Sequence, residues 1–282
     1  MKIIVKLLTG SLLLLITCSQ VCEAQYYYKD LVVTRQTASQ WKLYRDNNLR
    51  SVVLSSFEHD GSPTEGFQCD QSIGKDHSVI ITHTHSAGTS ESWLIASYSP
   101  EGMPVRTVDT SDTYRSVSEY QYDGTGRLIV LTNTSLETDN QLKEIEQHLW
   151  QYDQKGLPSG MLKIRNGTDT TFIRFVTDEK GHIAEEHASR NNKEMPAIYY
   201  YYDPSDRLTD IVRYNDKAQR LLPDFVFTYD NGELPVSMLV IREGGKDYQK
   251  WVYQYNAQGL KVKESCYNRQ KQLSGRIEYQ YK

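Results

Sequence analysis

One short pattern recurs along most of this chain and constrains its fold more than any other feature. It is clearest at residues 120–128, which read YQYDGTGRL: an aromatic residue, Asp, two residues, Gly, one residue and an aliphatic residue. Copies aligned on the Asp position follow one another at intervals of 24 to 30 residues, at Ser99, Asp123, Asp153, Asp178, Asp203, Asp230 and Asn256. Self-similarity at a nearly constant period predicts an array of one supersecondary unit.

Turn chemistry explains why these residue types recur at these positions. Asp or Asn in the first position accepts a hydrogen bond from the backbone two residues on, and Gly in the fourth adopts the left-handed conformation that closes a hairpin. In one copy Asp206 replaces Gly, which Asp tolerates, and in another Gly232 comes one residue early, which predicts a shorter loop. The predicted turn residues are Asp123, Gly126, Asp153, Gly156, Asp178, Gly181, Asp203, Asp206, Asp230, Gly232, Asn256 and Gly259.

A second set of turn signals lies between these copies. Asn166-Gly167 and Gly244-Gly245 belong to it, and such pairs are strong hairpin signals. Each unit is therefore expected to be two antiparallel strands with a turn at both ends. The 21 tyrosines fit strands that place aromatic side chains on one face. The predicted fold is all-β: a curved antiparallel meander of repeated hairpins with an N-terminal β cap.

The stretch 122–128, YDGTGRL, resembles the YD repeat of the RHS family, whose units read Tyr-Asp-x-x-Gly-Arg-Leu. The other copies keep the aromatic, the Asp or Asn, the Gly and the aliphatic residue but vary the Arg, and the resemblance covers residues 90–282. It implies a role as a shell, an adhesion module or an extracellular carbohydrate-binding protein, because the family's repeats serve all three. We do not extend it to toxin delivery, since the sequence shows neither the longer repeat series nor the self-cleaving core segment of RHS toxins.

Residues 1–24 read as a secretory signal peptide. Lys2 and Lys6 supply the positive start, residues 7–16 an apolar run too short to span a bilayer, and residues 22–24 a small-x-small cleavage site. The mature chain is therefore expected in the periplasm, on the cell surface or in the medium. A lipoprotein is less favoured, because Thr17 stands where the lipoprotein motif has a smaller residue.

Residues 25–90 lack clear copies of the pattern, and we interpret them as a β region that caps the array of residues 91–282. The segments 26–33 and 52–57 look like strands, whereas 41–47 could form a short helix or another strand. A repeat array needs an atypical end that covers its terminal strand.

The composition restricts the partners. Removal of the leader changes the formal charge from −4 to about −5, and this mild acidity argues against nucleic acid. No later apolar run is long enough for a transmembrane helix. Cys69 and Cys266 are the cysteines outside the leader. An oxidising compartment permits a disulfide, but the sequence leaves their pairing open, as it does the oligomeric state.

Catalytic and metal-binding signals are sparse. His83 and His85 lie two apart on a predicted strand and so share a face, a spacing that can chelate a metal if further ligands are near. The alternative is two solvent-facing imidazoles. No nucleophile elbow, phosphate-binding loop or dinucleotide fingerprint is present. We therefore predict no catalytic residue and no cofactor.

Aromatic residues that alternate near the turns are the candidate ligand-binding residues: Trp150, Tyr152, Tyr253 and Tyr255. Exposed on a broad sheet, such rings could stack on sugars or anchor a protein partner. Alternatively, they form the core face of the sheet.

These patterns favour an exported, non-enzymatic interaction or structural protein at the cell surface or in the periplasm. A carbohydrate-binding module for polysaccharide use is the alternative from another class. A third hypothesis is a hydrolase with an unrecognised site around His83, His85 and His59.

Overall fold

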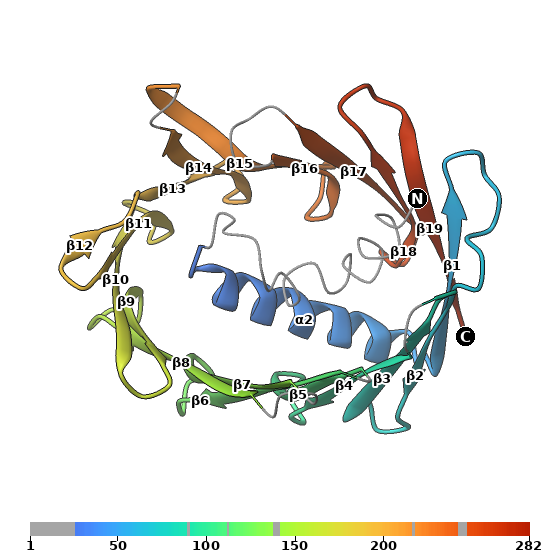
Figure 1. The fold of residues 1–282 in the computed structure, drawn as a ribbon, viewed down its shortest axis with the longest axis horizontal. Coiled ribbons are helices and arrows are strands. Elements are labelled where there is room, and N and C mark those ends of the chain that lie inside the picture. The colour runs from blue at the N-terminus through green and yellow to red at the C-terminus, as the bar shows by residue number, and fades with distance from the viewer. Residues whose placement is uncertain (1–25, 89–90, 112, 138–141, 216–217, 242–246) are drawn as a thin grey trace.

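The computed structural model describes residues 26–88, 91–111, 113–137, 142–215, 218–241 and 247–282. They form one α-helix and a 19-stranded antiparallel sheet (Figure 1). The bounds are α2 Lys29–Asp46, β1 Ser51–Glu58, β2 Gln68–Ile73, β3 Val79–His85, β4 Ser92–Tyr98, β5 Pro104–Thr110, β6 Tyr114–Tyr122, β7 Leu128–Glu137, β8 Leu142–Tyr152, β9 Pro158–Arg165, β10 Asp169–Thr177, β11 Ile183–Arg190, β12 Lys193–Glu194, β13 Ile198–Tyr202, β14 Leu208–Asn215, β15 Arg220–Tyr229, β16 Pro235–Ile241, β17 Tyr248–Tyr255, β18 Lys261–Tyr267 and β19 Leu273–Tyr281. The predicted signal peptide lies outside the described residues.

The sheet closes on itself to form a barrel. Strand β1 pairs with β2 on one side and with β19 on the other, so that Val52 lies opposite both Gln71 and Tyr281. The backbone N–H groups of Arg50 and Ser51 donate to the carbonyl of Lys282 at 2.7 and 3.0 Å. Strand β12 is only a two-residue extension of the hairpin that follows β11, because β11 also pairs directly with β13.

The predicted open meander with a β cap is therefore wrong. Strands β1 to β3, which were assigned to the cap, belong to the same sheet as the repeats, and the first and last strands are neighbours. The predicted antiparallel hairpins are present, but turn residues specify only pairing between consecutive strands. Closure removes both edges of the sheet, which makes a separate cap unnecessary.

The helix α2 runs across the interior of the barrel (Figure 1). Its buried side chains include Leu31, Thr34, Trp41 and Tyr44, a helical spacing. The predicted strand over residues 26–33 is wrong, and of the two alternatives for 41–47 the helix is correct. A closed sheet offers no edge for another strand, whereas a helix satisfies its own backbone hydrogen bonds.

The helix is shared by two core clusters, one at each end. The first surrounds the start of the helix and comprises Tyr26, Tyr27, Tyr28, Leu31, Leu128, Leu131, Trp150, Met161, Ile173, Phe175, Ile183, Ala188, Ile198, Tyr200 and Ile211. The second surrounds its end and comprises Trp41, Tyr44, Leu49, Val52, Leu54, Cys69, Ile73, Ile80, Leu260, Ile277 and Tyr279. The interior of the barrel is thus its core.

The helix end is fixed by specific contacts. Trp41 Nε1 donates to the His77 carbonyl at 2.6 Å, and the Tyr44 hydroxyl donates to Gln71 Oε1 at 3.1 Å. The indole of Trp41 also lies against Gly102, where an added Cβ would come within 2.1 Å of it. This turn glycine is therefore required both for its positive φ of 88° and for the close approach of the helix.

The repeated turns share one hydrogen-bond pattern. Asp123 Oδ1 accepts from the backbone N–H groups of Thr125 and Arg127 at 2.9 and 3.0 Å. These bonds, led by the one from the Arg127 N–H, lower the pKa of Asp123. The same two bonds, from the residues two and four positions on, are made by Asp153, Asp178, Asp203, Asp230 and Asn256. The Asp230 turn closes through Asp230 N and the Leu234 carbonyl, four residues apart as in the other copies. The prediction of a shorter loop there is wrong.

Six of the tyrosines at the ends of strands make a hydrogen bond that the repeat pattern did not indicate. The Tyr122 hydroxyl donates to the Pro104 carbonyl at 2.7 Å, and the Tyr152 hydroxyl to the Leu128 carbonyl at 2.7 Å. Each acceptor lies five residues after the Asp-like residue of the preceding turn. The same bond joins Tyr202 to Ile183, Tyr229 to Leu208, Tyr255 to Pro235 and Tyr281 to Lys261. We call this bond the tyrosine latch.

Candidate functional site

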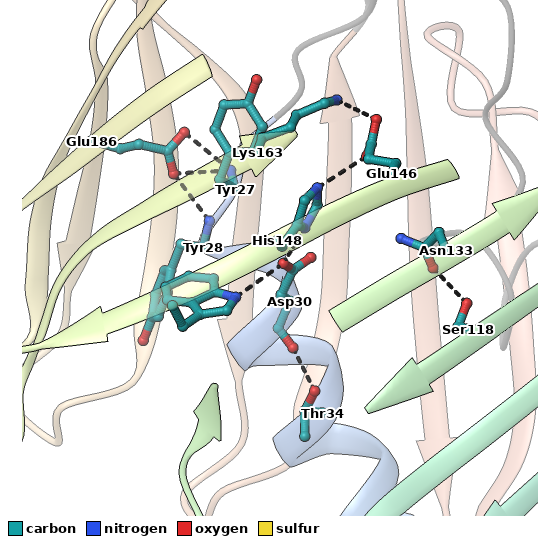
Figure 2. A network of polar contacts seen from close by, with 11 residues as sticks. Tyr27, Tyr28, Asp30, Thr34, Ser118, Asn133, Glu146, His148, Lys163 and Glu186 are labelled. Carbon is teal, nitrogen blue, oxygen red and sulfur yellow. Dashed lines mark hydrogen bonds and ion pairs between the residues drawn. The ribbon is translucent and has the colours of Figure 1, made fainter. Parts of the chain in front are cut away.

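A network of buried polar side chains holds the start of α2 against the barrel wall (Figure 2). Asp30, in the first helical turn, places Oδ2 2.6 Å from Nδ1 of His148 and accepts a hydrogen bond from Nε1 of Trp150 at 3.3 Å. Nε2 of His148 lies 3.0 Å from Oε1 of Glu146, whose other oxygen is 2.7 Å from Nζ of Lys163. Charges of opposite sign therefore alternate along a chain that leads from the helix into β8 and β9.

The network keeps its charges because its members are paired. The side chains of His148 and Asp30 are only 2% and 4% exposed. Burial disfavours the imidazolium, but the carboxylates of Asp30 and Glu146 outweigh it and raise the pKa of His148 to about 9. Burial likewise opposes ionisation of Glu146, yet its contacts with His148 and Lys163 lower its pKa to about 2.

A third carboxylate, that of Glu186 on β11, holds the segment that precedes the helix. It accepts hydrogen bonds from the backbone N–H groups of Tyr27 at 2.9 Å and Tyr28 at 3.0 Å, and from the Tyr200 hydroxyl at 2.7 Å. Figure 2 shows Glu186 pointing at these two backbone nitrogens. The groups at a helix start lack intrahelical acceptors, which favours an anion there. Burial raises the pKa of Glu186, and these hydrogen bonds partly offset it.

The chemical consequence of this arrangement is anchoring. Glu146, His148 and Glu186, whose pKa values are all shifted, are each engaged by other parts of the same chain, at the junction between helix and barrel. A general acid or base must instead reach a substrate proton. Perturbed pKa values mark functional sites only as a tendency, since structural ion pairs perturb them too.

The predicted ligand-binding aromatics lie in or near the core. Trp150 is 5% exposed and stacks on Phe175 with ring centroids 5.2 Å apart. Tyr152 is half-buried and engaged in a tyrosine latch. Tyr253 and Tyr255 are half-buried as well, and Nζ of Lys261 lies 4.7 Å from the ring centroid of Tyr253. The structure does not bring these side chains together as an exposed stacking surface.

His83 and His85 lie on the outer face of β3. The residues that alternate with them, Ile80 and Thr82, are buried on the inner face. His83 stacks on Trp93 of β4, and its Nδ1 and Nε2 lie 3.8 and 3.6 Å from carboxylate oxygens of Asp70 and Glu91. Within the described ranges, no group of three or more His, Cys, Asp or Glu side chains is arranged to hold a metal ion.

No role was assigned from the sequence to three residues that the structure singles out. Asp30 and Glu186 received no role, because only the closed barrel shows that both carboxylates face inward, where an unpaired charge is rarely buried. Trp93 also received none. It is 42% exposed, and as a bulky aromatic at an outward strand position it could have been identified once the strand was placed.

The two cysteines are separate free thiols, and both are buried. Burial and the nearby Glu264 carboxylate raise the pKa of Cys266 to about 12, and burial raises that of Cys69. Such thiols are poor nucleophiles. In the part of the chain that the structure describes, no helix has both the length and the apolar character needed to cross a membrane.

Fold and site together define a closed antiparallel β-barrel built around an internal helix. No family model matches the chain, and no curated protein matches it in sequence. A porin-like protein from Bacteroides uniformis is similar in structure, with a TM-score of 0.42 and 8% identity over 83% of this chain and 98% of that one.

Structures of toxin complexes are also similar over part of their length. A Tc holotoxin pore from Photorhabdus luminescens gives a TM-score of 0.30 and 12% identity over 77% of this chain and 15% of that one. The TcdB2–TccC3 complex gives a TM-score of 0.30 and 10% identity over 80% of this chain and 19% of that one. All these scores lie below 0.5, so the similarities carry no argument about function, and membership of the RHS family stays a prediction.

Proposed function

We propose that this protein is an exported, non-enzymatic interaction or structural module of the cell surface or periplasm. The observation that carries the proposal is the occupied barrel interior. The network of the buried Asp30 and His148 with the half-buried Glu146 and Lys163 holds the protein's own helix in place, and Glu186 holds the segment before it. Because the interior is occupied, other molecules would be bound by the outer face of the barrel.

Export supports the same proposal and has its own test. Expression of the full chain in a bacterial host should yield a mature protein that begins at Gln25, measured by intact mass and N-terminal sequencing of the periplasmic and medium fractions. A chain that stays in the cytoplasm with Met1 or Lys2 at its start would contradict export.

The interaction role is tested with the processed protein. Fluorescently labelled protein should bind isolated cell envelopes of the producing organism saturably, and unlabelled protein should compete. Chromogenic glycoside, ester and peptide substrates should not be turned over. Turnover that disappears in a His83→Ala/His85→Ala variant would favour the hydrolase hypothesis, and envelopes that bind no protein would overturn the interaction role.

Carbohydrate binding is a second candidate function, and one observation favours it. Trp93 is 42% exposed on the outer face and stacked on a second ring. An exposed tryptophan combines a large apolar face with a polar N–H group, as binding of a sugar ring requires.

A further inference from the structure

Trp93 differs from every other tryptophan of the chain. Trp41, Trp150 and Trp251 are 3%, 5% and 2% exposed and belong to the barrel interior, whereas Trp93 is 42% exposed on the outer face. Scattered apolar side chains on a surface need no explanation, so the argument depends on what surrounds this one.

The Trp93 ring is held in a defined orientation. His83 lies directly opposite Trp93 in the β3–β4 register, and the two rings stack with centroids 4.1 Å apart and planes at 21°. One indole face is thereby covered, which leaves the other face and the edge for a ligand. A side chain already fixed in its orientation loses less conformational freedom when a ligand binds. We call Trp93 and His83 the aromatic platform.

The two flanks of the platform carry complementary hydrogen-bonding groups. On the His83 side lie the carboxylates of Asp70 and Glu91, 56% and 59% exposed. On the other side Thr110 of β5 is opposite Trp93, and the exposed Arg115 of β6 is opposite Thr110. Acceptors therefore flank one side of the platform, and a hydroxyl and a guanidinium occupy outer-face positions on the other.

From this arrangement we propose that the aromatic platform is a subsite for one ring of a neutral saccharide. A sugar ring presents an apolar C–H face that stacks on indole, and its hydroxyls both donate and accept hydrogen bonds. A cationic ligand is the alternative that the carboxylates of Asp70 and Glu91 would favour, but Arg115 on the other flank would repel it. The inference rests on the second candidate function above and gives it a site.

The first experiment uses the emission of the exposed tryptophan. The processed protein is titrated with maltohexaose, cellohexaose, xylohexaose and chitohexaose, and with tetralysine as a cationic probe. At least one saccharide should produce a saturable blue shift, since Trp93 is the tryptophan that a ligand on the outer face can desolvate.

Variants then locate the site by calorimetry. With the saccharide that binds, Trp93→Ala should weaken the affinity at least about tenfold. Trp93→Phe should have a smaller effect, and His83→Phe, which keeps a ring for the stack, should retain most of the affinity. Tyr201→Ala removes an aromatic side chain that is 47% exposed on β13, and it serves as the matched control with unchanged affinity.

Three results would overturn the inference: no binding of any of the four saccharides, equal affinity in the wild type and Trp93→Ala, or binding of tetralysine alone that depends on Trp93. Saturable binding to cell envelopes without saccharide binding would refute this subsite and leave the interaction role standing. Absence of envelope binding would refute the interaction role itself.

Discussion

Single buried carboxylates join the helix to the barrel. Glu186 is 1% exposed and accepts hydrogen bonds from the backbone N–H groups of Tyr27 and Tyr28 at the helix start. Loss of one partner of a buried hydrogen bond costs the full desolvation of the group left behind. These residues are therefore expected to contribute far more to stability than exposed ion pairs, which are worth at most about 1 kcal/mol.

Replacement of Glu186 should show this directly. Glu186→Leu leaves the N–H groups of Tyr27 and Tyr28 unsatisfied and should lower the free energy of unfolding by about 2–5 kcal/mol in urea titrations. Glu186→Gln keeps an acceptor oxygen and should cost less. Glu185→Leu is the control, because Glu185 directly precedes Glu186, has a side chain that is 38% exposed and pairs with His187. A similar loss for Glu185→Leu and Glu186→Leu would contradict the anchoring role.

The pairing of His148 predicts a specific dependence of stability on pH. The pKa of His148 is raised from 6.5 to about 9 in the folded protein, so its contribution is fully present below 6.5 and is lost as the pH rises through about 9. The loss should be on the order of 3 kcal/mol. The pKa of Glu146 is lowered from 4.5 to about 2, so its contribution is present above 4.5 and is lost as the pH falls through about 2.

Urea titrations from pH 5 to pH 9.5 on the wild type and His148→Gln provide the measurement. The wild type should lose stability across this range, and the variant should lose markedly less because it has no imidazolium to deprotonate. Parallel curves for the two proteins would show that His148 isn't the titrating group.

The tyrosine latch explains why the hairpins repeat tyrosine rather than phenylalanine at this position. The hydroxyl of each latch tyrosine reaches the backbone of the preceding hairpin, so the bond ties one unit to the next. A phenylalanine would fill the same volume without this bond. The recurrence of Tyr in these copies thus has a cause beyond burial of an aromatic ring.

Tyr152→Phe and Tyr229→Phe should each lower the free energy of unfolding by about 1 kcal/mol, and the double variant by about the sum, because the two latches share no partner. Tyr201→Phe is the control, since Tyr201 is exposed on the outer face, and should change stability by less than about 0.5 kcal/mol. A neutral result for both latch tyrosines would remove the latch as an explanation of the repeat.

Neighbouring turns are connected by side chains as well. The Arg127 guanidinium lies 4.8 Å from the ring centroid of Tyr152, and Arg207 lies 4.8 Å from that of Tyr229. In both copies the Arg also pairs with the turn Asp four residues earlier. In these two copies the Arg side chain thereby connects its own turn to the strand that leads into a later turn.

Closure is expected to make the barrel and its internal helix one cooperative unit. The strand pairing between β1 and β19 joins residues 52 and 281, and side chains from both strands enter the cluster that surrounds the helix end. Opening of this seam would therefore expose Trp41 and Tyr44. Such a distant pairing carries a large loop-closure cost and is recovered only when the whole barrel forms.

Hydrogen exchange can test this coupling. Ile277 is fully buried at the seam, and Ile277→Ala should destabilise the protein by about 2–5 kcal/mol. The exchange protection of amides in β19 and in α2 should fall by the same amount. Leu221→Ala, at a position 41% exposed on β15, is the control and should alter neither. Faster exchange in β19 with unchanged protection in α2 would show that the seam opens without the helix.

The turns and hairpins of this protein could be predicted from its sequence, because they depend on contacts between nearby residues. The turns at Asp123, Asp153, Asp203 and Asn256 depend on hydrogen bonds between residues at most four positions apart. The alternation of side chains between the two faces of a strand is equally local. Antiparallel hairpins could therefore be predicted, as could the shared strand face of His83 and His85.

Tertiary structure alone decided the rest, because the deciding contacts join distant residues. Whether the ribbon stays open or closes depends on Val52 meeting Tyr281, and whether residues 29–46 form a strand or a helix depends on the space that the closed wall leaves inside. The roles of Asp30, His148 and Glu186 exist only once the helix is enclosed. No pattern of neighbouring residues carries that information, since a carboxylate on a strand looks the same in sequence whether it faces water or a buried backbone.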